Sequence, residues 1–487
     1  MNNNVKIKLN SVSFRDKVYA CWIGKNIGGT MGTPYEGKRE YLDIHGFSTA
    51  EGVVLPNDDL DLQLVWLHAV EQLGPRAIDA ATLGEFWLSF IVPHWNEYGI
   101  GKNNMSRGLL PPLAGDYENN WRDSNGAWIR TEVWACMAPG CPDIAAKYAM
   151  EDAKVDHGAG EGTYAAAFVA AMQAAAFVIP DLRKCIDIGL SKIPADSRMA
   201  DSIRLVLDCY DAGKTSRETR DTVLARNADI GDGWFEAPSN VAYTVLGLLY
   251  GEGDFKRSMI EALNCGDDTD CTGATVGATL GILGGTAAIP EDWSKHIGDD
   301  IVTISINRGG ACSRVPATCT ELTDRVIAQT PHVLFANNAY VALTDGEEVL
   351  PENAEEIVRK SVTLASLTPY MTHFEFSFAS ADVVLDSAPD IEPLGEKKVT
   401  VTLTNYRYVL DNKPYNLTMR WWLPEGFTVK GRQTAILFHK NSHNPGACTL
   451  EYTLVAGESV AATNRCVLEI VAEGRPAPMY IPVTLLG

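Results

Sequence analysis

Two short runs of aspartate, far apart in the sequence, contain the residue type that binds hard metal ions in proteins. The first run contains Asp58, Asp59 and Asp61, and the second contains Asp267, Asp268 and Asp270. Carboxylates at contact distance raise each other's pKa unless a cation neutralises them. If the two runs meet in the fold, their oxygens suit Mg²⁺ or Mn²⁺ better than zinc. The expected cage consists of Asp58, Asp59, Asp61, Asp268 and Asp270.

Each aspartate run lies where a helix is expected to begin. The apolar periodicity from Leu62 to Leu73 predicts a helix after the first run, ending at Gly74. The second run precedes an uncharged segment in which Gly273, Gly277 and Gly281 recur every four residues. These glycines share one helix face, so a neighbouring helix can approach very closely. Because helix N-termini favour negative charge, a plain helix cap is the alternative explanation for a single aspartate.

The two acidic motifs together resemble those of the ADP-ribosylglycohydrolase family. In that family an all-helical fold carries a two-magnesium site, formed by a Thr-Asp-Asp-Thr segment and a Gly-Gly-Asp-Thr-Asp-Thr-Thr segment. Here the first segment appears as Asn57-Asp58-Asp59-Leu60 and the second as Gly266-Asp267-Asp268-Thr269-Asp270-Cys271-Thr272. The resemblance implies one or two Mg²⁺ ions as the cofactor, with Mn²⁺ as an alternative. The implied metal ligands are Asn57, Asp58, Asp59, Asp268, Asp270 and Cys271.

Further segments add to the resemblance, which covers most of residues 12 to 295 in order and spacing. The segment from Ala20 to Gly37 is similar to the family's first helix and the Pro-Phe-Glu-Gly turn after it. Two other segments, 125–130 and 156–158, are similar to its substrate-side segments. The resemblance implies that Asn125, Gly126 and His157 bind the substrate. It implies catalytic roles for Glu36, Asp59 and Asp268, with one carboxylate taking a proton from water.

The sequence departs from the family pattern around these carboxylates. Asn57 and Leu60 stand where the family has threonines, and Cys271 replaces a threonine whose hydroxyl is expected on a metal. Leucine cannot ligate, and a thiol suits softer metals than Mg²⁺. Gly29 stands where the family's first helix usually has an aspartate. Extra acids in the two runs could compensate, so the metal count and the substrate both stay open.

Composition limits the classes of partner. The formal charge of −21 at pH 7 argues against a nucleic-acid partner or an anionic membrane surface, and it disfavours a diphosphate substrate. The expected partner is a small-molecule or protein-linked glycoside, with a homo-oligomer left open. The polar N-terminal residues lack a signal peptide's apolar stretch, and the most apolar run, 272–290, is too short to span a bilayer. Eleven cysteines without C-x-x-C spacing indicate reduced thiols, so the cytoplasm is the expected compartment.

A chain of 487 residues exceeds what one core usually supports, so two or three domains are expected. Helical patterns dominate the first part, with a long irregular stretch at 96–125 whose Trp and Asn residues suit a sugar site. From Phe374 onward, period-two alternation predicts antiparallel strands. The predicted fold is mainly α: an all-helical ADP-ribosylglycohydrolase-like domain at 1–365 and a smaller immunoglobulin-like β-sandwich at 366–487. The sandwich shows no catalytic cluster, so packing or dimerisation is favoured there over carbohydrate binding.

Three functions stay open at this point. The first is metal-dependent hydrolysis of an N- or O-glycosidic bond at a ribosyl-type anomeric carbon, with ADP-ribose as the substrate class that the resemblance implies. The second keeps this chemistry with a plain carbohydrate glycoside, which Trp-rich loops, the appended sandwich and the net charge favour. The third is a non-catalytic binding or structural member, which the altered threonines would permit. The leading hypothesis is the first, and it requires Asp58 and Asp268 to lie close together.

Overall fold

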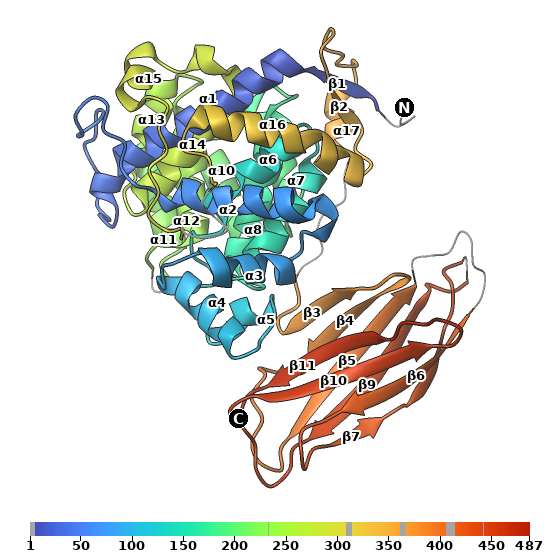
Figure 1. Cartoon of the computed structure of the whole chain (residues 1–487). Helices are drawn as coiled ribbons and strands as arrows, with labels where there is room; N and C mark the ends of the chain where they lie inside the picture. The colour runs from blue at the N-terminus through green and yellow to red at the C-terminus, as the bar shows by residue number, and fades with distance from the viewer. Residues whose placement is uncertain (1–4, 232, 308–313, 361–366, 406–413, 442) are drawn as a thin grey trace. The chain divides into compact units, whose positions relative to one another are not determined.

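The computed structural model describes residues 5–231, 233–307, 314–360, 367–405, 414–441 and 443–487. The chain divides into two compact units, whose elements are labelled in Figure 1. Unit 1 consists of residues 1–102 and 119–366, and unit 2 of residues 103–118 and 367–487. Unit 2 therefore includes a short segment from within the range expected for the helical domain.

Unit 1 is built mainly from α-helices, as Figure 1 shows. They are α1 (Ser11–Gly32), α2 (Asp58–Leu73), α3 (Ala80–Phe90), α4 (Asn96–Ser106, whose last residues belong to unit 2), α6 (Glu132–Met137), α7 (Pro142–Ala153), α8 (Glu161–Ala176), α9 (Leu182–Leu190), α10 (Arg198–Asp211), α11 (Ser216–Arg226), α12 (Ala237–Tyr250), α13 (Phe255–Leu263), α14 (Thr269–Gly284), α15 (Glu291–Ile297), α16 (Cys319–Ala336) and α17 (Ala354–Arg359). Short 3₁₀ helices are η1 (Thr33–Tyr35), η2 (Pro75–Ala77), η3 (Trp128–Arg130) and η4 (Thr286–Ala288). The helical fold predicted from the sequence is confirmed.

The predicted irregular stretch at 96–125 is wrong in its first part, because α4 begins at Asn96. Glycines and asparagines are poor helix formers, so the sequence hides this helix. Tertiary contacts help to stabilise it: the ammonium of Lys102 donates to the carbonyl oxygens of Ile91, Val92 and Pro93. These contacts fix the segment that precedes α4.

The backbones of α1 and α14 lie in direct contact. A methyl group on Gly24 would collide with the backbone of Gly277, and one on Gly28 with the backbone of Gly273. A methyl group on Gly281 would likewise collide with the backbone of α1. The close helix approach predicted from the glycine spacing is therefore confirmed. Both helices are almost wholly buried along this face.

A short parallel sheet accompanies the helices of unit 1. It pairs β1 (Ile7–Asn10) with β2 (Val341–Thr344). Each strand has 4 residues, too few for an alternating pattern to be recognised in the sequence. The pairing brings the start of α1 next to the segment that follows α16.

Unit 2 is a β-sandwich of two antiparallel sheets, as predicted. One sheet has the order β3-β4-β5-β9-β7 and the other β11-β10-β6-β8. The strands are β3 (Met371–Glu375), β4 (Ala379–Leu385), β5 (Glu396–Asn405), β6 (Tyr415–Trp422), β7 (Thr428–Gly431), β8 (Thr434–Leu437), β9 (Ala447–Val455), β10 (Asn464–Ala472) and β11 (Met479–Leu485). One buried core takes residues from both sheets, such as Val401 and Leu468. Period-two burial along β4 and β5 accounts for the alternation seen in the sequence.

The segment 103–118 belongs to the core of unit 2. Leu109, Leu113 and Tyr117 are buried in the same apolar cluster as the strands. This segment contains the short helix α5 (Leu113–Asp116). The hydroxyl of Thr484 donates to the carbonyl oxygen of Gly108, which ties the segment to β11.

None of the helices in the described part of the chain combines the length and apolar character of a membrane span. Every cysteine that the structure describes is a free thiol, as the spacing predicts.

We predict that Gly277→Ala destabilises unit 1, although alanine is the better helix former by about 1 kcal/mol. The added methyl group meets backbone atoms of Gly24, which cannot move aside as a flexible side chain can. Overpacking of this kind costs about 1–3 kcal/mol. The free energy of unfolding is measured by denaturant titration with far-UV circular dichroism.

Gly46→Ala is the control for this substitution, because nothing lies within 4 Å of a methyl group placed there. The control should unfold at the wild-type denaturant concentration. Equal stability of the two variants would contradict the close backbone contact between α1 and α14.

Candidate active site

A backbone bridge joins the loop after α1 to the loop before α14. The amide of Gly37 donates to the carbonyl oxygen of Asp267 at 2.8 Å, and the amide of Asp267 donates to the carbonyl oxygen of Lys38 at 2.6 Å. Asp267 adopts a positive φ of 66°, a conformation that aspartate tolerates better than most residues. The bridge brings Glu36, which follows η1, next to the acidic N-terminus of α14.

The first acidic run is fixed by a cap at the start of α2. The side-chain oxygen of Asn57 accepts the amide of Asp59 at 2.7 Å, a typical N-cap. The Asn57 amide nitrogen lies where a side chain on Gly29 would be. The family's aspartate is thus replaced by a glycine that leaves room for Asn57. The structure gives this predicted ligand a capping role.

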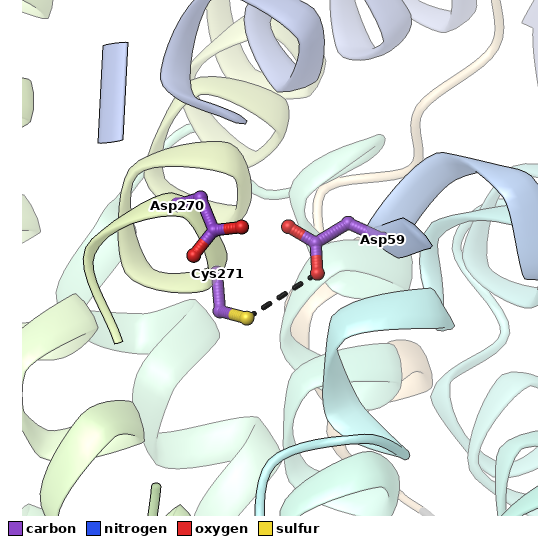
Figure 2. Close-up of side chains that lie close together, drawn as sticks. All are labelled: Asp59, Asp270 and Cys271. Carbon is purple, nitrogen blue, oxygen red and sulfur yellow. Dashed lines mark hydrogen bonds between the residues drawn. The ribbon is translucent and has the colours of Figure 1, made fainter. Parts of the chain in front are cut away.

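Two groups of carboxylates and one thiol lie close enough to share cations. In the first group, ligand atoms of Asp59, Asp270 and Cys271 lie within 4.8 Å of one another, and Figure 2 shows the three side chains converging. In the second, those of Glu36, Asp268 and Asp270 do the same. Asp270 belongs to both groups. The two remote aspartate runs therefore meet in space, as the leading hypothesis requires.

These carboxylates are buried without neutralising partners of their own. Asp59 is 0% exposed, Asp268 4% and Asp270 6%. No hydrogen-bond partner among the described residues reaches Oδ2 of Asp59 or Oδ1 of Asp270. A buried acceptor left unpaired is costly, more so when it is charged.

Burial raises the pKa of Asp59, Asp268 and Asp270 well above the ordinary value. For Asp270, the neighbouring carboxylates of Asp268 and Glu36 raise the pKa further. For Asp59, the ammonium of Lys25 acts in the opposite direction. Burial likewise raises the pKa of Glu36, with the charge of Asp58 as a second cause. Mutual repulsion of this kind is what a bound cation relieves.

Asp58 lines the pocket outside the two ligand groups, and Cys271 belongs to the first group. The hydroxyl of Tyr98 donates to Oδ2 of Asp58 at 3.1 Å, and burial is the main cause that raises the pKa of Asp58. The thiol of Cys271 donates to Oδ1 of Asp59 at 3.3 Å. Burial, followed by the charge of Asp268, raises the pKa of this thiol well above its ordinary value. The Cys271 thiol therefore keeps its hydrogen and donates it to the carboxylate of Asp59.

The two extra acids have structural partners. Oδ2 of Asp61 accepts the amides of Ile304 and Ser305 at 2.6 and 2.5 Å, which fixes a loop beside the pocket. Oδ2 of Asp267 accepts the side-chain amide of Asn240 at 3.1 Å. Neither acid belongs to any group of converging ligand atoms among the described residues.

A buried ion pair lies behind the first group. The ammonium of Lys25 lies 3.2 Å from Glu132, and both side chains are almost fully buried. Lys25 also donates to the carbonyl oxygen of Ile129 at 2.7 Å. Gln63 and Gln173 donate to the two oxygens of Glu132. Lys25 is thus paired with Glu132, and the charge of Lys25 only partly offsets the charge of Asp59.

A pocket of about 530 Å³ opens above these groups. Its lining includes Glu36, Asp58, Asp268, Asp270 and Cys271 from the predicted set, with Asn125 and Gly126 from the predicted substrate segment. Asn125 donates from Nδ2 to Oδ2 of Asp268 at 2.6 Å and accepts the indole N–H of Trp128 at 2.9 Å. Asn125 therefore orients Asp268 from the pocket wall. A side chain at Gly126 would collide with the carboxylate of Glu97.

His157 lies behind the pocket wall and is not among the lining residues that the structure describes. Its Nδ1 forms an ion pair with Asp156 at 2.9 Å, and its Nε2 lies 3.4 Å from the hydroxyl of Ser124, which does line the pocket. Arg130 pairs with Asp152 and Asp156, and it also donates to the carbonyl oxygen of Gly126. The buried Arg130 network thus fixes the predicted substrate segment.

The pocket also contains residues that the sequence did not single out. They are Glu97, Tyr98, Phe235, His94 and Trp95. Glu97 is 6% exposed, and burial raises the pKa of its carboxyl. Four of these residues lie at or just before the start of α4, and the sequence signal was the unusual stretch of Trp and Asn residues around Asn96. Only the fold shows that this stretch faces the acids.

The donor set fits a divalent cation. Five carboxylates from three segments converge, and they are the oxygen ligands that Mg²⁺ and Mn²⁺ take. Buried, unpaired oxygens on Asp59 and Asp270 supply the independent sign that a cation belongs there.

The fold and the site together define a helical domain with an acid-lined pocket. The family model of the ADP-ribosylglycohydrolases matches residues 10–328, and the chain belongs to this family of glycohydrolases. The family is typically metal-dependent. The resemblance stated from the sequence motifs is thereby confirmed.

Among solved structures, an ADP-ribosylglycohydrolase-related protein complex is 19% identical over 67% of this chain and 99% of its own, with a TM-score of 0.40. A FixG-related protein from Vibrio parahaemolyticus is 12% identical over 23% of this chain and 97% of its own, with a TM-score of 0.19. The GAE domain of GGA2p from Saccharomyces cerevisiae is 16% identical over 24% of this chain and 96% of its own, with a TM-score of 0.17. Comparison with curated proteins finds no match.

We predict that Lys25→Met lowers the free energy of unfolding by about 3–5 kcal/mol, because Glu132 keeps a buried charge without its cation. Adding Glu132→Gln to this variant should recover part of the loss. Chemical denaturation of the two variants gives both values.

The control for this pair is Arg15→Met, which breaks the exposed Arg15–Asp324 pair. Surface pairs contribute less than about 1 kcal/mol, so this variant should remain close to wild type. If the double variant were as unstable as Lys25→Met alone, the loss would come from packing and not from the stranded charge of Glu132.

Proposed function

We propose that the protein is a metal-dependent hydrolase that cleaves an N- or O-glycosidic bond at a ribosyl-type anomeric carbon. The substrate is a small-molecule or protein-linked glycoside, with ADP-ribose as the glycosyl group. The observation that carries this proposal is the position of Asp270, which belongs to both ligand groups and lines the pocket. Family membership supports the glycohydrolase class.

Asp58, Asp59, Asp268 and Asp270 would hold the cations, of which Mg²⁺ is the first choice and Mn²⁺ the second. A bound divalent cation supplies Lewis-acid chemistry and neutralises charge at this site. Asn57 holds Asp59 in register through the α2 cap, and Asn125 orients Asp268. These contacts restrict the carboxylates to one arrangement before the substrate arrives.

Glu36 is the proposed general base. It is the most exposed acid of the second group and lines the pocket, so it can reach a water molecule beside a bound substrate. Burial and Asp58 raise its pKa, which increases its basicity when it is ionised. Gly126 leaves room for the carboxylate of Glu97 in the pocket wall.

A plain carbohydrate glycoside is the second candidate substrate. Trp95 and Phe235 offer aromatic faces in the pocket, and Asn96 and Asn125 offer amides for hydroxyl groups. None of the described lining residues is a lysine or arginine, the side chains that usually bind a diphosphate. Trials with both substrate classes decide between the two candidates.

We predict that the protein hydrolyses an ADP-ribosylated peptide or one of a panel of aryl furanosides and pyranosides, and that EDTA abolishes the turnover. Product release is followed by chromatography for the peptide and by absorbance for the aryl glycosides. Glu36→Gln should lower kcat by about 10²- to 10⁴-fold, since a general base contributes that much.

Glu40→Gln is the matched control for Glu36→Gln. Glu40 is exposed in the same loop and lies outside the described pocket lining, so its loss should leave kcat unchanged. A well-folded protein that turns over none of these substrates with Mg²⁺ or Mn²⁺ present would support the non-catalytic alternative.

We also predict opposite effects of Asp270→Asn with and without Mg²⁺. In EDTA the variant should melt at a higher temperature than wild type, because a buried carboxylate repelled by Asp268 and Glu36 becomes neutral. Addition of Mg²⁺ should raise the melting temperature of wild type and much less that of the variant, since ligands that bind only the folded state stabilise it.

Asp43→Asn provides the control in the melting experiment. The Asp43 side chain is 94% exposed and pairs only with His45 in the described contacts, so this variant should respond to Mg²⁺ as wild type does. If neither Mg²⁺ nor Mn²⁺ changed the melting temperature of the wild-type protein, the result would argue against the metal site.

A further inference from the structure

The two ligand groups that share Asp270 differ in chemistry. The second group, Glu36, Asp268 and Asp270, offers only oxygen atoms. The first group, Asp59, Asp270 and Cys271, offers two carboxylates and a sulfur, and Figure 2 shows the sulfur beside the carboxylate of Asp59. The difference comes from one residue, Cys271, the third residue of α14.

The first group has the geometry of a site and not of a chance cluster. Oδ2 of Asp59 and Oδ1 of Asp270 are buried and without a hydrogen-bond partner among the described residues. Both carboxylates point toward the space beside the sulfur in Figure 2. All three side chains are at least nine-tenths buried.

The spacing is also close to that of a coordinated ion. With Zn–S near 2.3 Å and Zn–O near 2.0 Å, ligand atoms on a tetrahedral ion lie roughly 3.5 Å apart. Sγ of Cys271 and Oδ1 of Asp59 already lie 3.3 Å apart, and all three ligand atoms lie within 4.8 Å. A contraction of at most about 1.3 Å would close the group on one ion.

We infer that the Asp59, Asp270 and Cys271 group is a mixed oxygen and sulfur site that binds a thiophilic divalent cation, such as Zn²⁺, Co²⁺ or Cd²⁺, in preference to Mg²⁺. Thiolate ligands select such ions, whereas carboxylates alone suit Mg²⁺ and Mn²⁺. The all-oxygen group of Glu36, Asp268 and Asp270 keeps the preference for a hard ion. This inference rests on the proposed function, because it assigns the metal class of the same pocket.

Ligation replaces the hydrogen on the sulfur. The S–H bond that now points at Asp59 breaks, its electron pair forms the bond to the cation, and the proton passes to solvent. No electron is gained or lost, so no oxidant or reductant is needed. Asp59 then loses the hydrogen bond from the thiol and binds the same cation as the sulfur.

The test uses the full chain after EDTA treatment and removal of the chelator. Titration with Cd²⁺ should produce the ultraviolet charge-transfer band of a cadmium thiolate, saturating at one ion per chain, and Mg²⁺ should produce none. Cys271→Ser should lose the band, and so should Cys271→Thr, which restores the hydroxyl that the family has here. Calorimetry on the same samples should show a larger loss of affinity for Cd²⁺ than for Mg²⁺ in both variants.

Cys265→Ser is the matched control. Cys265 is also a buried thiol, just before the acidic run, but it donates to the carbonyl oxygen of Glu261 and belongs to neither ligand group. This variant should keep the band. A band that survives in Cys271→Ser or Cys271→Thr, or that disappears in the control, would overturn the inference.

Two further outcomes separate this inference from the proposed function. Binding of Cd²⁺ and Mg²⁺ with no thiolate band would overturn the mixed site and leave a metal-dependent hydrolase standing. Absence of any divalent binding in calorimetry would sink both. If the Cys271 variants fail to fold, X-ray absorption on wild-type protein loaded with one Zn²⁺ replaces them: one sulfur neighbour among oxygens supports the site, and an all-oxygen shell overturns it.

Discussion

The contact between the backbones of α1 and α14 is the constraint on which the rest of the site depends. Glycines let the two helices touch along their length, so their relative register has almost no freedom. The end of α1 and the start of α14 therefore arrive at the same place, where Gly37 and Lys38 pair with Asp267. Glu36 and Asp268 are more than 200 residues apart in the sequence. They line one pocket because the two helix backbones are in direct contact, with no side chain between them.

The electrostatic repulsion within the pocket lowers the stability of the fold. Acids from α2 and α14 are buried together beside the more exposed Glu36, and the buried ammonium of Lys25 is paired with Glu132. Each carboxylate thus raises the free energy of its neighbours, which the surrounding core must offset. Such stored repulsion is typical of functional sites, since a ligand that relieves it binds more tightly.

Local sequence patterns predicted the parts of the site that depend on local structure. The aspartate runs, the helix they begin and the glycine stripe are all visible within a few turns of chain, and the structure has them as expected. The pocket wall formed by Glu97, Tyr98 and Phe235 was not predictable, because a weak helix and a remote loop meet there only through tertiary packing. The role of Asn57 as a cap is also local, but the family resemblance implied metal ligation at this position instead.

The segment 103–118 has a consequence for how the chain is organised. Its apolar side chains, among them Leu109 and Leu113, complete the core of the sandwich, although both neighbouring stretches of sequence belong to the helical unit. The sandwich is therefore discontinuous, because the polypeptide contributes two separate segments to it. A protein cut after residue 366 would keep this segment while losing the strands that bury it, so neither half is an autonomous module. Transfer of the sandwich to another protein by recombination would therefore require two separate gene segments to be transferred together.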